Sequence, residues 1–462
     1  MRRAGLASLL ALLLAGCAIA KFSLGPEDAP LLPHYVLAHE DGWPASTERE
    51  ALQPEAYEAH VDRILAGIDA HARRIWAESR EGGKDPLRIL VFVHGGLNGY
   101  AADFRRMREL VRGGPERPAI FPRTFYYPVF VNWNSALGDS LFDDLIFIRF
   151  GKRRPWWVGL PTAPFVLGAR LAEGLFSTPN SWWANTRNFD ELDPQPADWA
   201  ESLALLPIRG LTTPFLKAFG TSAWQIMRRR ADLLVTPRLG DNPANATEGA
   251  AQTLVRKLCA RVTCGGSGEP VWRIPPRDGA LESGPVEITF VGHSMGALVV
   301  NRLLASRHEL PVRRIVYLAP AASIDEVEGL LAPYLKAHSG APTGASELRV
   351  FVLSRKDEAG ERDPSGLLPR GTLLVWIDNF FEPVTIPGHL RLGRYKAYGD
   401  YYRGAPPPYL RVHAMTSASA TEPRTHGSFD DGPFFERILC TVDRDAFRDP
   451  QTCADKIYAS GE

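Results

Sequence analysis

Several kinds of signal are missing from this 462-residue sequence. Basic and acidic side chains balance at 53 each, so the net charge gives no reason to expect a nucleic acid partner. The sequence contains no HExxH zinc motif, no GxxxxGK phosphate loop and no dinucleotide fingerprint, so nothing supports a cofactor and we expect none. No internal repeat is visible. The chemistry is therefore expected to come from the side chains of the chain itself.

Cysteine is also scarce, with five residues in the whole chain. Apart from Cys17, they form two pairs that are close in sequence, Cys259 with Cys264 and Cys440 with Cys453. This arrangement suits two short disulfide loops in an oxidising compartment, although sequence alone does not fix the pairing. The alternative is four buried thiols or a metal held by four thiolates, but the short CxxC spacing of zinc sites is missing.

The N-terminus has the features of an export signal. Arg2 and Arg3 precede an apolar run at 6–14, and the small residues of LAGC follow, with Cys17 at the end. This ending resembles the lipobox of bacterial lipoproteins, which implies a lipidated Cys17 after a signal peptide at 1–16. The implied location is the bacterial cell envelope, lipid-anchored on the periplasmic side of the outer membrane. The alternative is an ordinary secretory signal with an incidental cysteine. Residues 17–50 are expected to form a tether.

Apolar and β-branched runs alternate with helical patterns along the rest of the chain. This alternation predicts an α/β fold with a mostly parallel sheet and helices on both faces. Sites in such sheets lie at the carboxyl ends of the strands. The predicted strands are 88–94, 129–133, 288–291, 314–319 and 348–354, and predicted helices follow at 101–111 and 297–304.

A long segment separates the second of these strands from the third. Residues 136–284 exceed what one crossover helix needs, so we expect a large, mainly helical insertion between two parts of a catalytic domain, 51–135 and 285–462. The insertion is rich in tryptophan, including the pairs 156–157 and 182–183. It is either a packed helical subdomain or a lid that touches lipid or an acyl substrate; its prolines argue against a membrane span.

The most informative segment is VEITFVGHSMGALVV, residues 286–300. It predicts a strand, a tight turn with Ser294 between two glycines, and a helix. A serine hydroxyl is a weak nucleophile, and such a turn exposes its oxygen to a base and a substrate together. The alternative is an ordinary strand–helix turn without chemistry.

Four blocks carry a resemblance to the α/β-hydrolase superfamily, and within it to bacterial serine hydrolases of largely unassigned substrate. The blocks are VFVHGGLN at 91–98, FVNWNS at 130–135, GHSMG at 292–296 and VFVLSRKD at 350–357. The resemblance covers 85–150 and 285–445, not the insertion. It implies an α/β-hydrolase fold with nucleophile, acid and histidine in that chain order.

The resemblance also implies the remaining site residues. The acid that orients the histidine is expected at Asp357, with Glu358 and Asp363 as rivals. The base is expected at His426, in the loop THGSF that matches the terminal histidine loop of the superfamily. Of the other histidines after Asp357, His389 is a rival, whereas the one at 413 lies inside a predicted strand and is badly placed to move protons.

Backbone amides should complete the site. An oxyanion hole needs N–H groups aimed where negative charge develops. The amide of Met295 offers one donor, and Gly96 or Leu97 in the first glycine turn offers the other. His94 is expected to support this turn, and His293 to pack or form a hydrogen bond beside the serine.

These residues lead to two hypotheses. The first is a serine hydrolase that cleaves a carboxylic ester, or a lipid-like ester, through an acyl-enzyme; transfer of the acyl group to another alcohol would use the same residues. The second is an inactive envelope scaffold that kept the fold and binds a partner through the aromatic insertion. Fold analogy alone does not separate them. A scaffold has no need of serine, acid and histidine together, which favours the enzyme.

The lipobox generates the first testable prediction. The change Cys17→Ser should abolish lipid attachment, because it removes the acylated sulfur, and should release the protein from salt-washed membranes. Mass spectrometry of the mature N-terminus checks the modification, and an unmodified N-terminus in the wild-type protein would refute it.

Overall fold

The structure is a computed structural model that describes residues 25–39, 42, 45–47, 50–79, 84–95, 99–114, 118–149, 152–176, 196–236, 248–263, 269–276, 281–338, 347–361, 370–415, 422–454 and 456. Its centre is an eight-stranded sheet. The strands are β1 (Tyr35–Ala38), β4 (Leu87–Val93), β5 (Tyr126–Trp133), β8 (Val271–Ile274), β9 (Glu282–His293), β10 (Arg314–Leu318), β11 (Glu347–Val352) and β12 (Leu410–Ala414).

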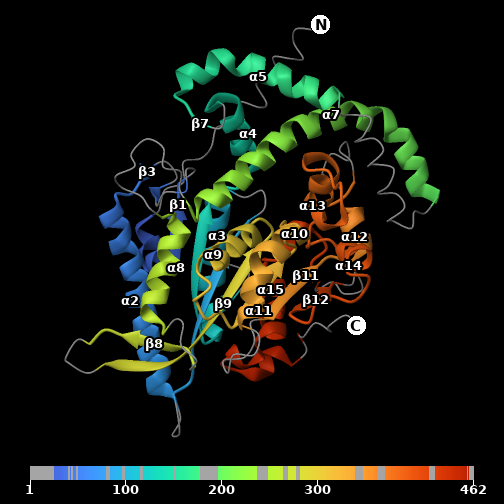
Figure 1. Ribbon diagram of the computed structural model, residues 1–462. Coiled ribbons are helices and arrows are strands. Elements are labelled where there is room, and N and C mark those ends of the chain that lie inside the picture. The colour runs from blue at the N-terminus through green and yellow to red at the C-terminus, as the bar shows by residue number, and fades with distance from the viewer. Residues whose placement is uncertain are drawn as a thin grey trace.

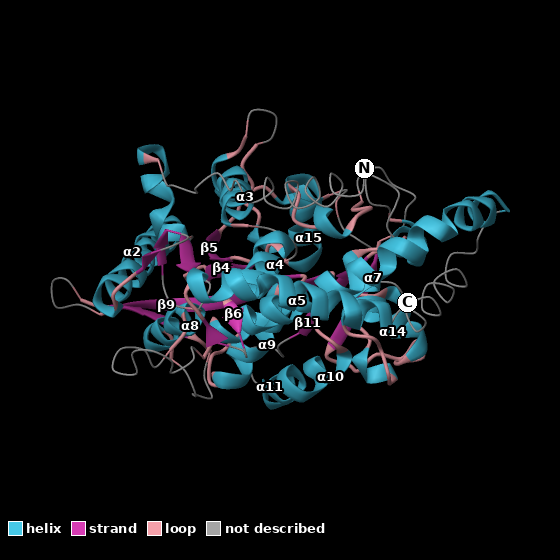
Figure 2. Ribbon diagram, turned by 90° about the horizontal axis from the view of Figure 1, so that it is seen from above, coloured by secondary structure: helices cyan, strands magenta, loops and turns pink. Residues whose placement is uncertain are grey.

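Seven strands run parallel in the order β1-β5-β4-β9-β10-β11-β12, and β8 pairs antiparallel with β9. The main helices are α2 (Pro54–Glu78), α3 (Tyr100–Arg112), α8 (Ala250–Arg261), α9 (Gly296–Ser306), α11 (Ala332–His338) and α15 (Gly432–Val442). In Figure 2, α3 and α15 lie on one side of the sheet and α9 and α11 on the other. Both faces are covered, so most side chains of the central strands are buried, including all eight of β5. The α/β class and all five predicted strands are confirmed.

Short elements connect these parts. They are β2 (Ala45–Thr47), β3 (Glu50–Ala51), β6 (Ile148–Arg149), β7 (Lys152–Arg153), α10 (Ile324–Glu326), α12 (Arg355–Gly360), α13 (Leu373–Trp376), α14 (Tyr395–Asp400), η1 (Pro26–His34), η3 (Val327–Leu331), η4 (Ile377–Phe381), η5 (Pro387–His389) and η6 (His426–Ser428).

A tether was expected at 17–50, but residues 26–38 of this segment are part of the folded domain. Residues 26–34 form η1, and β1 is an edge strand of the central sheet with all four side chains buried. The reason is physical: YVLA is a short apolar run that extends the sheet beyond β5. Pro26, Pro30 and Pro33 all lie within η1.

The expected insertion at 136–284 also needs a new boundary. Three helices, α4 (Leu137–Ile146), α5 (Trp156–Phe176) and α7 (Pro196–Leu233), lie beyond the carboxyl ends of the strands (Figure 1). By contrast, α8 and β8 belong to the body: Tyr57 of α2 donates a hydrogen bond to the carbonyl of Ala250 in α8, and β8 pairs with β9. The separate helical part therefore ends before residue 249.

The tryptophans of this part fall into two groups. Trp224 in α7 is fully buried, as expected for a packed subdomain, whereas Trp156 and Trp157 at the start of α5 are 61% and 63% exposed. The pair at 182–183 lies outside the described residues. No helix in the described ranges is long and apolar enough to cross a membrane.

A disulfide joins Cys440 of α15 to Cys453. This confirms one of the two predicted pairs and excludes a metal held by all four thiolates. Cys264, the second member of the other pair, and Cys17 lie outside the described residues.

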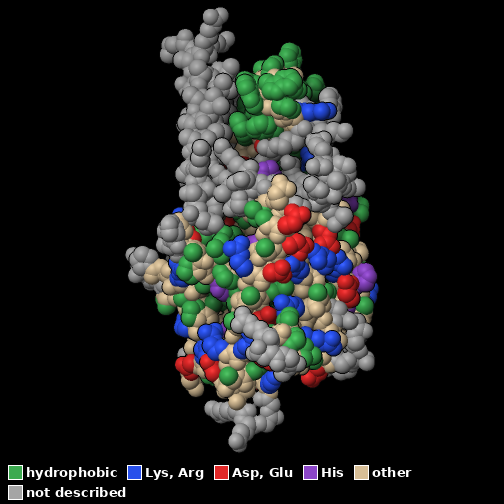
Figure 3. Space-filling view, turned by 90° about the vertical axis from the view of Figure 1, so that its left-hand side faces the viewer, with side chains coloured by type: hydrophobic (Ala, Val, Ile, Leu, Met, Phe, Trp, Pro, Cys, Tyr) green, Lys and Arg blue, Asp and Glu red, His purple; other side chains and the backbone are tan. Residues whose placement is uncertain are grey.

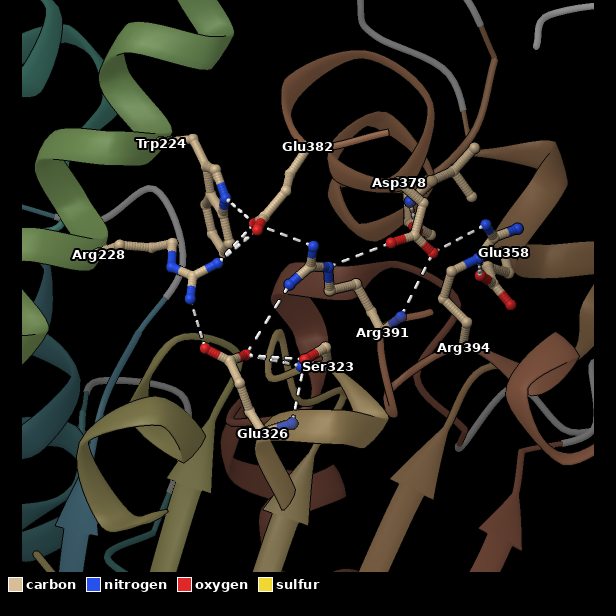
Figure 4. A network of polar contacts seen from close by, with 11 residues as sticks. Trp224, Arg228, Ser323, Glu326, Glu358, Asp378, Glu382, Arg391 and Arg394 are labelled. Carbon is tan, nitrogen blue, oxygen red and sulfur yellow. Dashed lines mark hydrogen bonds and ion pairs between the residues drawn. The ribbon is translucent and has the colours of Figure 1, made fainter. Parts of the chain in front are cut away.

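A buried ionic network attaches α7 to the segment after β11 (Figure 4). Trp224 and Arg228 of α7 both donate hydrogen bonds to Glu382, at 2.8 Å and 2.6 Å. The guanidinium of Arg391 contacts Glu382 at 3.0 Å and Asp378 at 3.1 Å. Asp378 also receives Arg394 at 3.1 Å. Asp378, Arg391 and Arg394 are buried, so each of these charges depends on its partners, whereas Glu382 is 44% exposed.

This network predicts a specific loss of stability. The change Asp378→Ala removes the carboxylate shared by two buried guanidinium groups, so the free energy of unfolding should fall by about 3–5 kcal/mol. The matched control is Arg73→Ala, which breaks an exposed pair with Glu282 and should cost less than about 1 kcal/mol. Urea unfolding measures both, and equal losses would contradict the prediction.

Candidate active site

Ser294 lies at the joint between β9 and α9. Its φ is 51°, a left-handed conformation that costs free energy for a residue with a Cβ and is stored at functional turns. Two glycines make the joint possible. A Cβ at Gly296 would lie 2.0 Å from the carbonyl oxygen of Val93, and one at Gly292 would lie 2.9 Å from the amide nitrogen of Ala297. The predicted tight turn is therefore present.

His426 is the histidine that reaches Ser294. Its Nε2 lies 2.8 Å from the serine Oγ, and both side chains are buried. This is the position that the sequence predicts for the base. The other two histidines lie elsewhere: His413 is inside β12 and stacks on Phe351, and His389 is exposed in η5.

The environment of His426 keeps its ring neutral. Burial and, to a smaller extent, the neighbouring His293 lower the pKa of this imidazole to about 3, although the carboxylate of Asp430 acts in the opposite direction. At neutral pH a neutral Nε2 can accept the hydroxyl proton of Ser294, which is what a general base requires.

The predicted acid, Asp357, lies in the first turn of α12. Its carboxylate accepts a hydrogen bond of 2.6 Å from Ser354, the N-cap of that helix. The Nδ1 atom of His426 has no hydrogen-bond partner within the described part of the chain. The rival Glu358 pairs with Arg394, and Asp363 lies outside the described residues. The role of Asp357 stays a prediction.

Sequence reasoning missed a buried charge cluster beside the pair. Asp430 Oδ2 lies 3.3 Å from His293 Nδ1 and 2.5 Å from the guanidinium of Arg106 in α3. Burial alone would raise the pKa of Asp430, but His293 and Arg106 outweigh it and lower the value to about 2. The Nε2 atom of His293 faces the carbonyl oxygen of His426 at 3.1 Å. The cluster thus holds the histidine loop against β9.

A second carboxylate approaches the same loop. Glu361 accepts a hydrogen bond of 2.9 Å from the backbone N–H of His426, and burial raises the pKa of Glu361.

Of the predicted oxyanion donors, the structure describes Met295. Met295 follows the nucleophile and is fully buried. A Cβ at Gly95 would lie 2.5 Å from the Met295 amide nitrogen, so the glycine turn after β4 packs directly on this amide. Gly96 and Leu97 lie outside the described residues. His94 supports the turn as expected: its ring nitrogen receives the Trp133 N–H at 2.9 Å.

The fold and the site together define an α/β protein with a buried serine–histidine pair at the carboxyl edge of a parallel sheet. Comparisons with protein-family models, with curated proteins and with solved structures found no match. Among the residues described, no group of three or more histidine, cysteine, aspartate or glutamate side chains is arranged to hold a metal ion.

The low pKa of His426 predicts how stability depends on pH. The folded-state pKa of about 3 lies below the unfolded value of about 6.5, so the unfolded chain binds the extra proton as the pH falls between them. Stability is therefore lost in that window. From pH 7 to pH 5, the wild type should lose about 2 kcal/mol more of its free energy of unfolding than His426→Gln. Urea titrations check this, and parallel losses would contradict it.

Proposed function

We propose that this protein is a serine hydrolase with an α/β-hydrolase fold that cleaves carboxylic esters. The observation that supports this most strongly is the contact of 2.8 Å between Ser294 Oγ and His426 Nε2 on a left-handed strand–helix turn. A φ of 51° costs free energy for serine. A nucleophile turn accepts this cost because the conformation presents the hydroxyl to the base.

The reaction proceeds in two steps. Ser294 Oγ attacks the ester carbonyl while His426 accepts its proton; the C–O bond to the alcohol then breaks, and His426 gives that proton to the leaving alcohol. This leaves an acyl-serine. Water repeats the sequence, with His426 as base, and releases the acid. The Met295 amide, with Gly96 or Leu97, stabilises the negative oxygen of each tetrahedral intermediate.

The substrate is an ester or lipid-like molecule at the bacterial cell envelope, where a lipid on Cys17 anchors the chain. Ser294 has no exposed surface in this structure, so a substrate reaches it only when a covering segment moves. The alternative functions are an acyltransferase that uses the same residues and an inactive scaffold. The hydrogen-bond distance between Ser294 and His426 favours the enzyme, since a scaffold has no need of a serine and a histidine in contact.

Covalent labelling tests the nucleophile. Wild-type protein should react with a fluorophosphonate, and Ser294→Ala should lose both labelling and hydrolysis of a short-chain ester, the latter by roughly 10³-fold or more. A matched control is Ser79→Ala, a serine at the end of α2 whose hydroxyl donates to the carbonyl of Ile75, and it should still permit labelling. Wild-type protein that never labels would favour the scaffold.

Paired substitutions test the acid. If Asp357 orients His426, Asp357→Asn should lower kcat/KM by roughly 10³–10⁴-fold, because the histidine loses its orientation and the imidazolium its countercharge. Asp363→Asn is the control and should retain most activity, and His426→Ala should be severely impaired. A larger loss in Asp430→Asn than in Asp357→Asn, with both variants folded, would instead assign the acid role to Asp430.

A further inference from the structure

The helix α5 differs from an ordinary surface helix, because many of its large apolar side chains are exposed to solvent. Its buried residues are the glycines Gly159 and Gly174. A Cβ on the first would lie 1.4 Å from the carbonyl oxygen of Ile146 in α4, and one on the second 2.3 Å from that of Pro214 in α7. The helix therefore approaches its neighbours most closely at these glycines. Val158, Val166, Leu167 and Leu171 are partly buried, and the aromatic side chains face away from the protein.

The outward face of α5 is large and apolar. Its exposed side chains are Trp156 at 61%, Trp157 at 63%, Leu160 at 55%, Phe165 at 79%, Leu175 at 62% and Phe176 at 88%. Figure 3 shows a group of hydrophobic side chains at the same end of the molecule. Across 21 residues, about 30 Å, the charged residues are Arg170 and Glu173, and Arg170 turns back to Asp144 in α4. Such a face is unfavourable in water and marks an interaction surface.

Charge at the edge of this face indicates its partner. The segment RFGKRRP, residues 149–155, brings four cations and no acid directly before the two tryptophans, and Arg154 is exposed. Tryptophan beside basic residues is the combination that lies at the boundary between lipid headgroups and acyl chains. A second copy of this face would bring Glu173 as its one carboxylate, whereas an anionic bilayer offers many phosphates to the cations.

We propose that α5 docks on the surface of an anionic lipid bilayer, with its apolar face in the headgroup boundary and Arg154 among the phosphates. The proposal stands independently of the hydrolase activity and of Cys17. A lipid on Cys17 would add a second attachment, and two signals together make a stable one.

Vesicle flotation tests the docking. The full chain carries Cys17→Ser, so that no lipid is attached, and every variant shares the same N-terminus. At low ionic strength this Cys17→Ser protein, the reference for the variants below, should float with vesicles of phosphatidylethanolamine and phosphatidylglycerol and bind phosphatidylcholine vesicles more weakly. High salt should release it, as it does from salt-washed membranes. The triple variant Trp156→Ser, Phe165→Ser and Phe176→Ser should lose roughly tenfold or more in affinity. The matched control, Leu281→Ser with Ile386→Ser, removes two equally exposed apolar side chains from other elements and should bind as the wild type does.

Two further variants separate the contribution of the cations to vesicle binding from that of the apolar face. Arg153→Glu with Arg154→Glu should weaken binding to the anionic vesicles and leave binding to phosphatidylcholine unchanged. Trp156→Phe with Trp157→Phe keeps the apolar face, so it should still bind but lose the fluorescence that brominated lipids quench. Thermal unfolding shows that each variant is folded, and a short soluble ester reports the serine site separately.

Four outcomes would overturn the proposal. The triple variant could bind vesicles as well as the wild type does, or the wild type could bind neither vesicle. Equal binding to both vesicles, unaffected by the glutamate variant, would exclude anionic lipid as the partner. Sedimentation that shows a wild-type dimer, dissociated by the triple variant and without vesicle binding, would assign the face to a second copy of the chain.

Discussion

The arrangement of the candidate site depends on how closely the ends of β4 and β9 approach each other. Gly95, at the end of the first strand, would collide with the backbone of His293 if it carried a Cβ, at 2.3 Å, and Gly296 would collide with Val93 at 2.0 Å. The two strand–turn segments can therefore touch backbone to backbone. This contact supports Ser294 at a φ of 51° and sets the Met295 amide against the glycine turn. Strain in the one turn is offset by the packing of both.

Buried charge then fixes the base relative to the nucleophile. His426 lies on a short loop, and a loop needs support to hold a side chain within hydrogen-bond distance. His293 provides it, since oxygen atoms face both of its ring nitrogens: the carbonyl of His426 at 3.1 Å and the carboxylate of Asp430 at 3.3 Å. Arg106 completes the pairing of Asp430 from another helix. Burying this set is costly, so it contributes position more than stability.

The sequence predicts those parts of the protein that local patterns specify. Apolar runs located the strands, and the glycines around Ser294 located the turn, because both are determined by backbone and burial within a few residues. His426 followed from chain order. Asp430 was not predictable, since FDDG before an apolar run has the pattern of a helix start and its partner Arg106 is distant in sequence. The exposed apolar face of α5 could not be predicted for another reason. When a helix is apolar on all sides, its composition does not indicate which side faces the protein.

The attachments of α7 limit how a substrate could reach Ser294. At one end, Arg230 is buried and contacts Asp143 at 2.6 Å and the carbonyl of Asn134 after β5 at 3.1 Å. A few residues earlier, Trp224 and Arg228 join the network around Arg391. Lifting α7 as a unit would break both sets, and loss of the buried pair between Arg230 and Asp143 alone costs about 3–5 kcal/mol. The pair that holds α5, Arg170 with Asp144, is 28% and 8% exposed, whereas Arg230 and Asp143 are 4% and 6% exposed. Breaking the contact of α5 therefore costs less than breaking that of α7. The part of the molecule best able to move is thus also the part whose surface is apolar.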